Sequence, residues 1–305
     1  MDNQPRTAKP SVSCPCCSGT SAYLLSSTDL NRNTSTDWFD YYQCPSCELT
    51  FLHPVPRDLR PYYRGGYEPI PKSLAELRVM ANAQRFRLDP ILKHKSSGRL
   101  LEIGPWIGVF SSNAKDAGFD VTAIEIDTAC VDFLNNIVGI NALHSSDPAE
   151  TMETLSEQFD VIAFWHSLEH LTRPWYVIEK AAQRLAPGGI LLIAIPDIES
   201  YDFSVLKSAW QHLDAPRHLS FYAARGLHKL CAANGLRTLN LVTNDPLSTE
   251  LSLGAWRQRA RSTVRIRVIR KLWGDFLFHR AMKRSHGHGS GLTAIFGKPS
   301  LGREP

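Results

Sequence analysis

The chain has 305 residues, 43% of them hydrophobic and 21% charged, which excludes a disordered protein and allows one large and one small domain. The formal net charge is +4, but ten Lys and Arg against one acid crowd into residues 251–290, where an anionic partner is expected to bind. The longest apolar stretch, residues 190–195, is too short to span a bilayer, and the polar N-terminus shows no secretory signal. A cytoplasmic protein is expected.

Five of the seven cysteines crowd near the N-terminus, which is typical of a metal site and not of a secreted disulfide framework. They include two CxxC pairs, which together supply the four thiolates of a structural zinc site. Residues 1–55 are therefore predicted to be a zinc-ribbon-like module that depends on its metal for stability. Cys16 is a surplus thiol that could replace a neighbour, and a redox dithiol is the alternative. The predicted zinc ligands are Cys14, Cys17, Cys44 and Cys47.

Residues 56–95 are predicted to be a linker rich in Pro, Gly and Tyr, followed by a leading helix at 72–94. Tyr63 in this linker is a candidate to contact an acceptor molecule, although packing the linker onto a domain is the more ordinary role. From residue 96 onward, short apolar runs alternate with helical segments, which predicts an α/β fold with a parallel sheet covered on both faces. The predicted strands are 99–104, 120–126, 159–164 and 189–195, and the predicted helices between them are 111–118, 128–138 and 172–185.

Acidic residues and glycines come at the ends of the first two predicted strands. Glu102 precedes Gly104 and Gly108, and glycines there let the backbone approach a ligand. The segment lacks the GxGxxG pattern that holds a dinucleotide, and its acid suits a ligand with a cationic amino group. Glu125 ends the second strand, where a carboxylate can accept hydrogen bonds from both hydroxyls of a ribose. The combination fits an adenosyl ligand that carries an amino acid.

Four segments resemble the motifs of class I S-adenosylmethionine-dependent methyltransferases, in order and spacing: LLEIGP at 100–105, AIEID at 123–127, FDVIAFWHSLEH at 159–170 and LAPGGILLI at 185–193. The resemblance covers roughly residues 96–245 and implies a doubly wound, Rossmann-like sheet with an antiparallel last strand. It implies that glycines flank the methionine of S-adenosylmethionine, although Trp106 stands where the family usually has glycine. Asp147 is implied to approach the adenine. The predicted cofactor-binding residues are Glu102, Gly104, Gly108, Glu125, Ile126, Asp147 and Trp165.

Histidines follow the third predicted strand. His166 and His170 are spaced to share one helical face, and His170 is the preferred base to deprotonate a hydroxyl or carbon acceptor, with a structural role as the alternative. The same letters match a zinc-protease pattern, but they follow a buried strand directly, which argues against it. A second polar cluster at Asp214, Arg217 and His218 resembles a stretch often found in the same family. These three residues, with Tyr63, are the predicted acceptor contacts, and a salt-bridged loop is the alternative.

Residues 246–287 are predicted to be a basic amphipathic helical insertion. Val264, Val268, Leu272 and Phe276 recur every four residues, with arginines such as Arg265 opposite them. Such a helix suits an anionic membrane surface, and the expected place is the inner face of a membrane. Packing against the chain's own domain is the alternative. Residues 288–305 are predicted to supply the closing antiparallel strand and a tail.

Three functions remain open on these grounds. The first is a methyltransferase acting on a small-molecule or lipid-linked acceptor such as a sugar, because similar zinc-bearing modules occur in deoxysugar methyltransferases. The second is an RNA methyltransferase in which the zinc module and the basic helix bind phosphates, although the motif for methylating exocyclic amines is absent. The third is a non-catalytic scaffold that kept the fold, which the bulky Trp106 brings into consideration.

Overall fold

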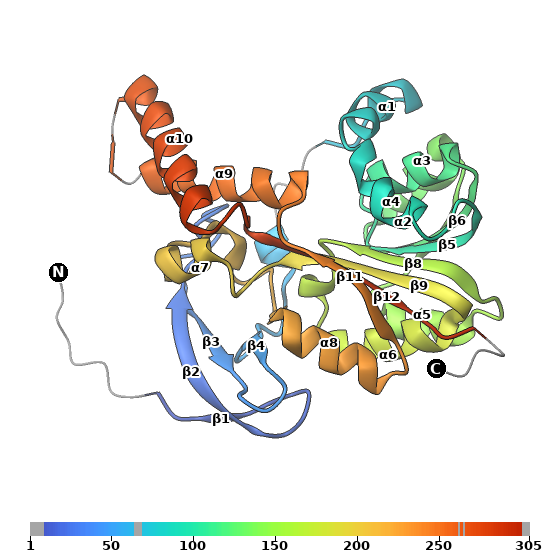
Figure 1. Ribbon diagram of the computed structural model, residues 1–305, viewed down its shortest axis with the longest axis horizontal. Coiled ribbons are helices and arrows are strands. Elements are labelled where there is room, and N and C mark those ends of the chain that lie inside the picture. The colour runs from blue at the N-terminus through green and yellow to red at the C-terminus, as the bar shows by residue number, and fades with distance from the viewer. Residues whose placement is uncertain (1–8, 64–68, 262, 265, 301–305) are drawn as a thin grey trace.

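The computed structural model describes residues 9–63, 69–261, 263, 264 and 266–300, and two β-sheets organise them (Figure 1). The larger sheet has seven strands in the order β11-β12-β9-β8-β5-β6-β7. Its strands from β5 to β9 pair in parallel, whereas β12 runs antiparallel to both β9 and β11. The predicted doubly wound sheet with an antiparallel strand near its end is confirmed. The strands are β5 (Gly98–Ile103), β6 (Phe119–Glu125), β7 (Asn141–His144), β8 (Phe159–Trp165), β9 (Leu185–Pro196), β11 (Arg237–Val242) and β12 (Gly291–Gly297).

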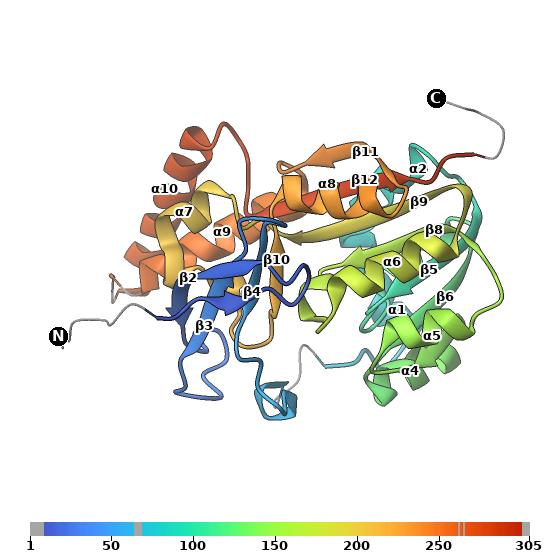
Figure 2. The ribbon, with the colours of Figure 1, turned by 90° about the horizontal axis from the view of Figure 1, so that it is seen from below.

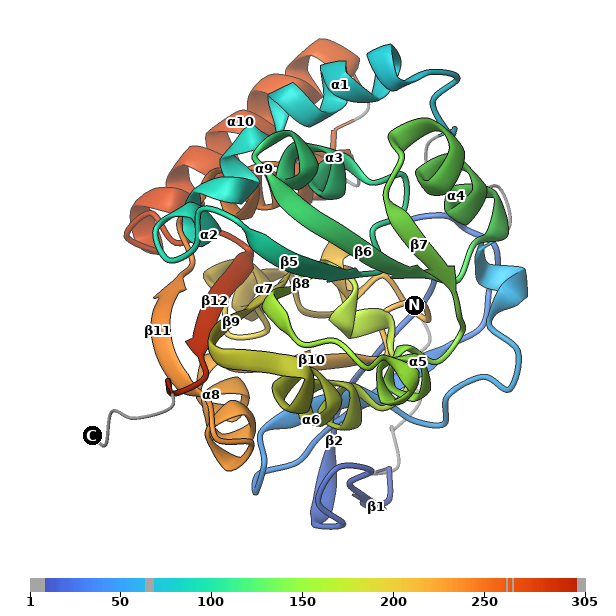
Figure 3. The same ribbon diagram turned by 90° about the vertical axis from the view of Figure 1, so that its right-hand side faces the viewer.

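Helices cover both faces of the large sheet, which explains why its central strands are apolar along their whole length. Figure 3 shows α1, α3 and α4 on one face and α5, α6 and α8 on the other. Two buried apolar clusters lie beneath the two sets of helices, and a third, which includes Tyr41, Trp210 and Phe221, lies at the small sheet. The helices are α1 (Leu74–Ala83), α2 (Asp89–Leu92), α3 (Val109–Asp116), α4 (Thr128–Phe133), α5 (Pro148–Thr154), α6 (Pro174–Arg184) and α8 (Ala224–Ala233).

The smaller sheet is antiparallel and has the order β1-β2-β3-β4-β10 (Figure 2). Its first four strands come from the N-terminal segment, but β10 lies in the chain between β9 and α8. β10 pairs with β4 through Ser220 and Phe51 and through Tyr222 and Leu49. The N-terminal segment is thus joined to the part of the chain that carries the large sheet by main-chain hydrogen bonds. The strands are β1 (Val12–Ser13), β2 (Thr20–Ser27), β3 (Phe39–Gln43), β4 (Leu49–Leu52) and β10 (Ser220–Tyr222).

Two predicted elements have different bounds in the structure. The leading helix predicted over 72–94 is divided into α1, the 3-10 helix η2 (Arg85–Leu88) and α2, because Pro90 starts a new helix and cannot donate a backbone hydrogen bond. The glycines at 188 and 189 were predicted to stop a helix before the fourth strand. They instead lie inside β9, which already begins at Leu185 and shifts register against β8.

Two helices, α9 (Pro246–Arg261) and α10 (Arg267–Arg284), lie between β11 and β12 and pack on each other and on α7 (Tyr201–Leu206). Val264 was predicted to lie on the basic helix, but it precedes α10. The predicted helical residue Arg265 lies outside the described residues. Within the part of the chain that is described, no helix combines the length and the apolar character that crossing a bilayer requires.

Candidate active site

The carboxyl ends of β5 and β8 meet where the strand order reverses, the position at which open α/β sheets bind ligands, and β6 lies on the other side of β5. Glu102 on β5 is buried there and accepts a hydrogen bond from the hydroxyl of Ser111 on α3. Burial raises the pKa of Glu102 to about 7, and the Ser111 hydroxyl and the Arg87 guanidinium limit the rise. The carboxyl group of Glu102 is therefore partly protonated near neutral pH, and a cation bound beside it would favour its ionised form.

Glu125, the last residue of β6, is held in one orientation by backbone donors. Its Oε2 accepts a hydrogen bond from the Trp106 N–H (2.8 Å), and its Oε1 accepts from the N–H groups of Ile126 (2.7 Å) and Asp127 (3.0 Å). The side chain of Ile126 is exposed beside it. A carboxylate fixed in this way is suited to recognising the hydroxyls of a ribose.

The loop after β5 needs both of its predicted glycines. Gly104 and Gly108 have φ values of +69° and +78°. A Cβ atom on Gly104 would lie 2.7 Å from the Cβ of Ser167, and one on Gly108 would lie 2.4 Å from Cδ2 of Leu134. Trp106 between them also has a left-handed φ of +52°, and its side chain packs against the core cluster below. Close approach of this loop to Ser167, which follows β8, explains Gly104, and close approach to Leu134, which follows α4, explains Gly108.

Unsatisfied donors beside this loop indicate the kind of ligand that belongs there. The Arg87 guanidinium on η2 lies 5.4 Å from the ring centroid of Trp165 at the end of β8. Among the described residues, neither Nε of Arg87 nor Nε1 of Trp165 has a hydrogen-bond partner. Buried donors without acceptors are costly, so a ligand with an acidic group fits this position. Sequence reasoning missed Arg87, since an arginine in a leading helix gives no sign of burial.

Asp147 has structural partners of its own. Its Oδ1 accepts the N–H groups of Ala149 and Glu150 at the start of α5, and its Oδ2 pairs with Arg173 at 2.8 Å. Capping and ion pairing occupy both oxygens, and the role predicted for Asp147 at an adenine stays a prediction.

The histidines after β8 do not lie on a helix face, so the prediction of a shared helical face for them is wrong. His166 has a left-handed φ of +53°, and only Leu168–His170 form a short 3-10 helix, η4. This turn places His166 Nδ1 3.3 Å from Oε1 of Glu169. It also sends His170 toward the segment around Arg217. The turn arises because the chain leaves a buried strand and must reverse within a few residues.

The rings of His170 and His218 lie against each other, and Nδ1 of each ring has a backbone carbonyl oxygen as its partner. Nδ1–H of His170 donates to the carbonyl oxygen of Arg217 (3.1 Å), with the Tyr63 hydroxyl also 3.1 Å from Nδ1. Nδ1–H of His218 donates to the carbonyl oxygen of His212 (2.8 Å). These partners leave the lone pair on Nε2 of each ring. The two ring centroids are 4.6 Å apart, and burial together with His218 lowers the pKa of His170 to about 4.

Glu169 completes a cluster of proton acceptors. Ligand atoms of Glu169, His170 and His218 lie within 4.8 Å of one another. Burial would raise the pKa of Glu169, but His166, whose Nδ1 lies 3.3 Å from Oε1, and the two other histidines nearby lower it to about 2. Neither of its oxygens has a partner with hydrogen-bond geometry among the described residues. The cluster can therefore hold one added positive charge, either a proton or a metal ion.

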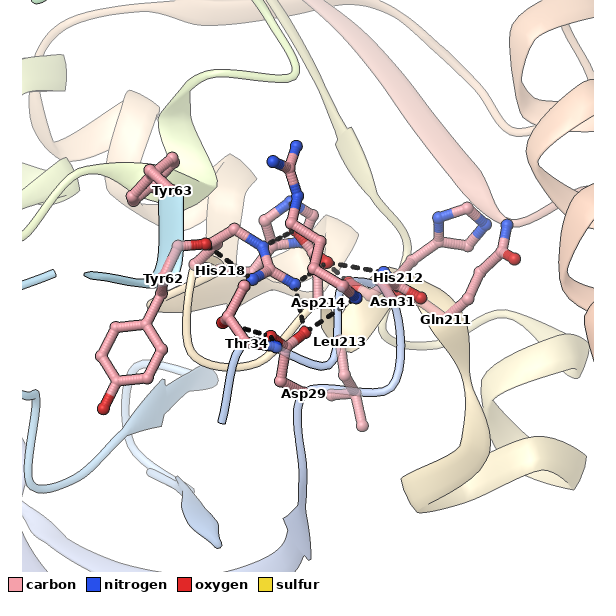
Figure 4. A network of polar contacts seen from close by, with 12 residues as sticks. Asp29, Asn31, Thr34, Tyr62, Tyr63, Gln211, His212, Leu213, Asp214 and His218 are labelled. Atoms are coloured by element: carbon pink, nitrogen blue, oxygen red, sulfur yellow. Dashed lines mark hydrogen bonds and ion pairs between the residues drawn. The ribbon is translucent and has the colours of Figure 1, made fainter. Parts of the chain in front are cut away.

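Arg217 is fully buried and joins the loop before β10 to the segment after β2. Figure 4 shows the polar network that includes Asp29 and Asp214. Its Nη2 donates to Oδ1 of Asp29 (2.7 Å), which lies after β2, and its Nε donates to Oδ2 of Asp214 (2.8 Å). Nη1 donates to the carbonyl oxygen of Tyr62 (3.0 Å). The predicted acceptor contacts of Asp214 and Arg217 stay predictions, and this burial favours the alternative of a salt-bridged loop.

An open cavity of about 420 Å³ adjoins the histidine cluster. It lies between the N-terminal segment, the loop before β10 and α9. Every residue that lines it has a polar side chain, and the set offers both hydrogen-bond donors and acceptors. The lining residues are Asn31, Arg32, Gln211, His212, Asp214, His218 and Gln258.

The four predicted zinc ligands come together at one end of the small sheet. Their sulfur atoms lie within 4.8 Å of one another, with Cys14–Cys47 and Cys17–Cys44 at 3.5 Å. Each pair is followed by a residue with positive φ, Ser18 or Glu48, whose N–H donates to the carbonyl of the first cysteine. Burial raises the pKa of Cys44, but backbone donors outweigh it and bring the pKa to about 6. Cys16 is outside the group, and the arrangement is compatible with tetrahedral zinc.

Comparison with known proteins agrees with this geometry. A family model described as a methyltransferase domain matches residues 75–241. A ubiquinone biosynthesis O-methyltransferase from Aromatoleum aromaticum is 24% identical over 201 residues, covering 59% of this chain and 83% of that protein. A protein of the same name from Chelativorans sp. is 30% identical over 140 residues, which are 43% of this chain and only 54% of that relative. A solved SAM-dependent methyltransferase from Archaeoglobus fulgidus shares the fold, with TM-score 0.51, 18% identity, and coverage of 73% of this chain and 96% of that one.

Proposed function

This chain belongs to the family of proteins built on this methyltransferase domain, and from that premise we propose that its methyl acceptor is a hydroxyl group on a small polar molecule. The protein is an S-adenosylmethionine-dependent methyltransferase with a Rossmann-like fold. The unpartnered buried donors beside the β5 loop suit the acidic end of that cofactor. Zinc bound by the four cysteines is the second proposed ligand, with a structural role.

The cofactor is proposed to lie across the carboxyl ends of β5 and β6. Glu125 would accept hydrogen bonds from its ribose, and Glu102 would face its ammonium group. Arg87 and Trp165 would donate to its carboxylate, which removes the cost of their unsatisfied donors. When bound, the cofactor supplies a methyl group that is made electrophilic by the neighbouring sulfonium.

Proton removal is the task left to the chain's own residues. The acceptor hydroxyl would give its proton to Nε2 of His170, beside His218, and its oxygen would take the methyl group that the bound cofactor supplies, with the cofactor's sulfur as the leaving group. A histidine with a pKa of about 4 is a weak base by itself. The buried carboxylate of Glu169 already limits this decrease in the pKa of His170, and it would stabilise the imidazolium that forms. Positioning of the acceptor at the end of β8 supplies the rest of the rate acceleration.

A hydroxyl-rich acceptor such as a sugar, free or lipid-linked, fits the cavity beside His218. Polar side chains line it throughout, and a sugar can satisfy them with several hydroxyls. The names of the two curated relatives, both O-methyltransferases, also support an oxygen acceptor. The observation that carries the proposal is the convergence of Glu169, His170 and His218 at the edge of this cavity.

Transfer of labelled methyl groups from S-adenosylmethionine to a panel of sugars, lipid-linked sugars, phenols and RNA tests this function. His170→Gln is expected to reduce kcat by roughly 10²–10⁴-fold, while the Kd for the cofactor stays unchanged. His228→Gln, on the exposed side of α8, is the matched control and should keep full activity. Unchanged turnover in His170→Gln would contradict the assigned base. Label that enters RNA alone would replace the small-molecule acceptor with the nucleic-acid alternative.

A further inference from the structure

Helix α10 turns its apolar residues away from the protein. Val268 and Leu272 are 70% and 65% exposed, and Ile269, Trp273 and Phe276 beside them are also exposed. Figure 1 shows α10 at the outer end of the molecule, beyond α9 and far from the central strands of the large sheet. An amphipathic surface helix normally buries such a stripe against its own domain. This helix does not, so a different environment must cover the stripe.

The opposite side of α10 already holds it against the protein. Gly274 and Ala281 are buried there, and a Cβ atom on Gly274 would lie 2.9 Å from Cα of Arg257 on α9. So close a crossing fixes which side of α10 faces α9. The apolar stripe cannot rotate inward without breaking this contact, and the sequence-based alternative of packing on its own domain is excluded for the stripe.

The same helix carries strong positive charge. Its only acidic residue, Asp275, is neutralised by Arg257, whose Nε lies 2.6 Å from Oδ1. Arg280 and Lys283 are exposed on the side that carries the apolar stripe, one to two turns further along. Two copies of this face would repel each other, and a nucleic acid would leave the apolar stripe uncovered. The cationic residues of α10 are Arg267, Arg270, Lys271, Arg280, Lys283 and Arg284.

We propose that α10 docks on the anionic surface of a lipid bilayer, with its apolar residues inserted among the headgroups and its cations on lipid phosphates. Trp273 and Phe276, whose stacked rings have centroids 5.3 Å apart, lie at the depth where aromatic residues favour the membrane interface. An anionic bilayer thus binds both the charge and the apolar stripe of α10. Neither a second copy of this face nor a nucleic acid does so.

Docking would hold the acceptor cavity close to the membrane. Gln258 of α9 lines the cavity, while the adjacent Arg257 contacts α10. Only α9 then separates the cavity from the membrane-bound helix, a span of about 10 Å, one helix diameter. This consequence rests on the proposed function, because it makes a lipid-linked acceptor the best substrate. The docking itself does not depend on methyl transfer.

Sedimentation with phosphatidylcholine vesicles, with and without phosphatidylglycerol, tests the docking. The full chain is expected to bind only the anionic vesicles, and added salt should release it. Leu272→Glu should weaken binding at least tenfold, since it places an acid in the inserted stripe. Val79→Glu is the matched control, because Val79 on α1 is 73% exposed and lies outside the docking face.

A charge series sharpens the test. Arg280→Gln with Lys283→Gln should weaken vesicle binding roughly 30-fold, from about 1 kcal/mol per cation, and the control pair Lys93→Gln with Arg99→Gln should leave it unchanged. Brominated acyl chains should quench the fluorescence of Trp273, and Trp273→Phe should remove that quenching. Equal binding of all variants, or self-association in solution that Leu272→Glu abolishes, would overturn the proposal. These substitutions should leave the affinity for S-adenosylmethionine unchanged when it is measured without vesicles. That affinity therefore tests the proposed function separately from the docking.

Discussion

The central strands of the seven-stranded sheet are buried on both faces, whereas much of the five-stranded sheet is half exposed. Every residue of β12 is buried, for example, but most of β2 is only partly covered. The large sheet is stable through apolar packing of its two clusters. The small sheet also packs apolar residues, such as Leu49 and Phe221, into buried clusters, and three further features hold it: the cysteine cluster, the pairing of β10 with β4, and the buried ion pair of Arg217 with Asp29.

The largest effect is expected from breaking the cysteine cluster. Cys44→Ser should abolish zinc binding and unfold the small sheet, because structural zinc contributes roughly 10–16 kcal/mol of apparent binding free energy. Zinc content and circular dichroism measure the two effects. Cys16→Ser is the control and should retain zinc, since its sulfur lies outside the cluster. A folded, fully active Cys44→Ser protein would show that the small sheet, like the large one, is stable without a metal.

Removing one side of the buried ion pair is the next largest change. Arg217→Met should reduce the free energy of unfolding by about 3–5 kcal/mol, because Asp29 remains buried without its partner. Denaturant unfolding measures the loss. Arg60→Ala, which breaks the exposed pair with Asp58, is the control and should leave the free energy of unfolding nearly unchanged. An equally small loss in Arg217→Met would mean that the small sheet is stable without this ion pair.

A change in the large sheet should affect binding more than folding. Glu125→Ala is expected to weaken S-adenosylmethionine binding about 100-fold, equivalent to one or two hydrogen bonds to a charged group. Titration calorimetry measures it. Asp120→Ala, at the other end of the same strand β6, should bind the cofactor normally. Unchanged affinity in Glu125→Ala would remove the proposed ribose contact and the assignment of this crevice.

The smallest expected effect is a pH dependence of cofactor affinity. Burial raises the pKa of Glu102 to about 7, so the carboxyl is protonated below that pH and cannot attract an ammonium group. Affinity should fall by up to about tenfold per pH unit as the pH drops below 7, and it should level off above 7. Glu102→Gln should bind weakly at every pH, with a flat profile. The same steep profile in this variant would assign the titration to another group.

Patterns local in the chain were predicted well, and long-range partners were not. The spacing of the cysteine pairs and the apolar runs of β5, β6, β8 and β9 predicted elements that the structure contains, because both depend on neighbours in sequence. The pairing of Asp29 with Arg217 could not be read from the chain, since the two residues lie far apart in sequence and meet only in the folded protein. The cavity between Asn31 and Gln258 is equally a product of the fold.

The sequence also could not predict the direction in which a side chain points. The four-residue period correctly indicated an apolar stripe at Val268, Leu272 and Phe276, but periodicity does not say whether a stripe faces the protein or its surroundings. His166 likewise matched a helical spacing, yet the chain turns through a left-handed residue there. Arg87 gave no signal, because its burial depends on the tryptophan at the end of β8.

The placement of β10 in the small sheet has a consequence for how the protein is made. A ribosome delivers β4 early, at Leu49–Leu52, and delivers its partner Ser220–Tyr222 only after most of the large sheet has been translated. The edge of β4 therefore stays unpaired while the nascent chain grows, and the small sheet is completed only after β10 has been synthesised. Separate expression of the two halves would leave each with an open strand edge.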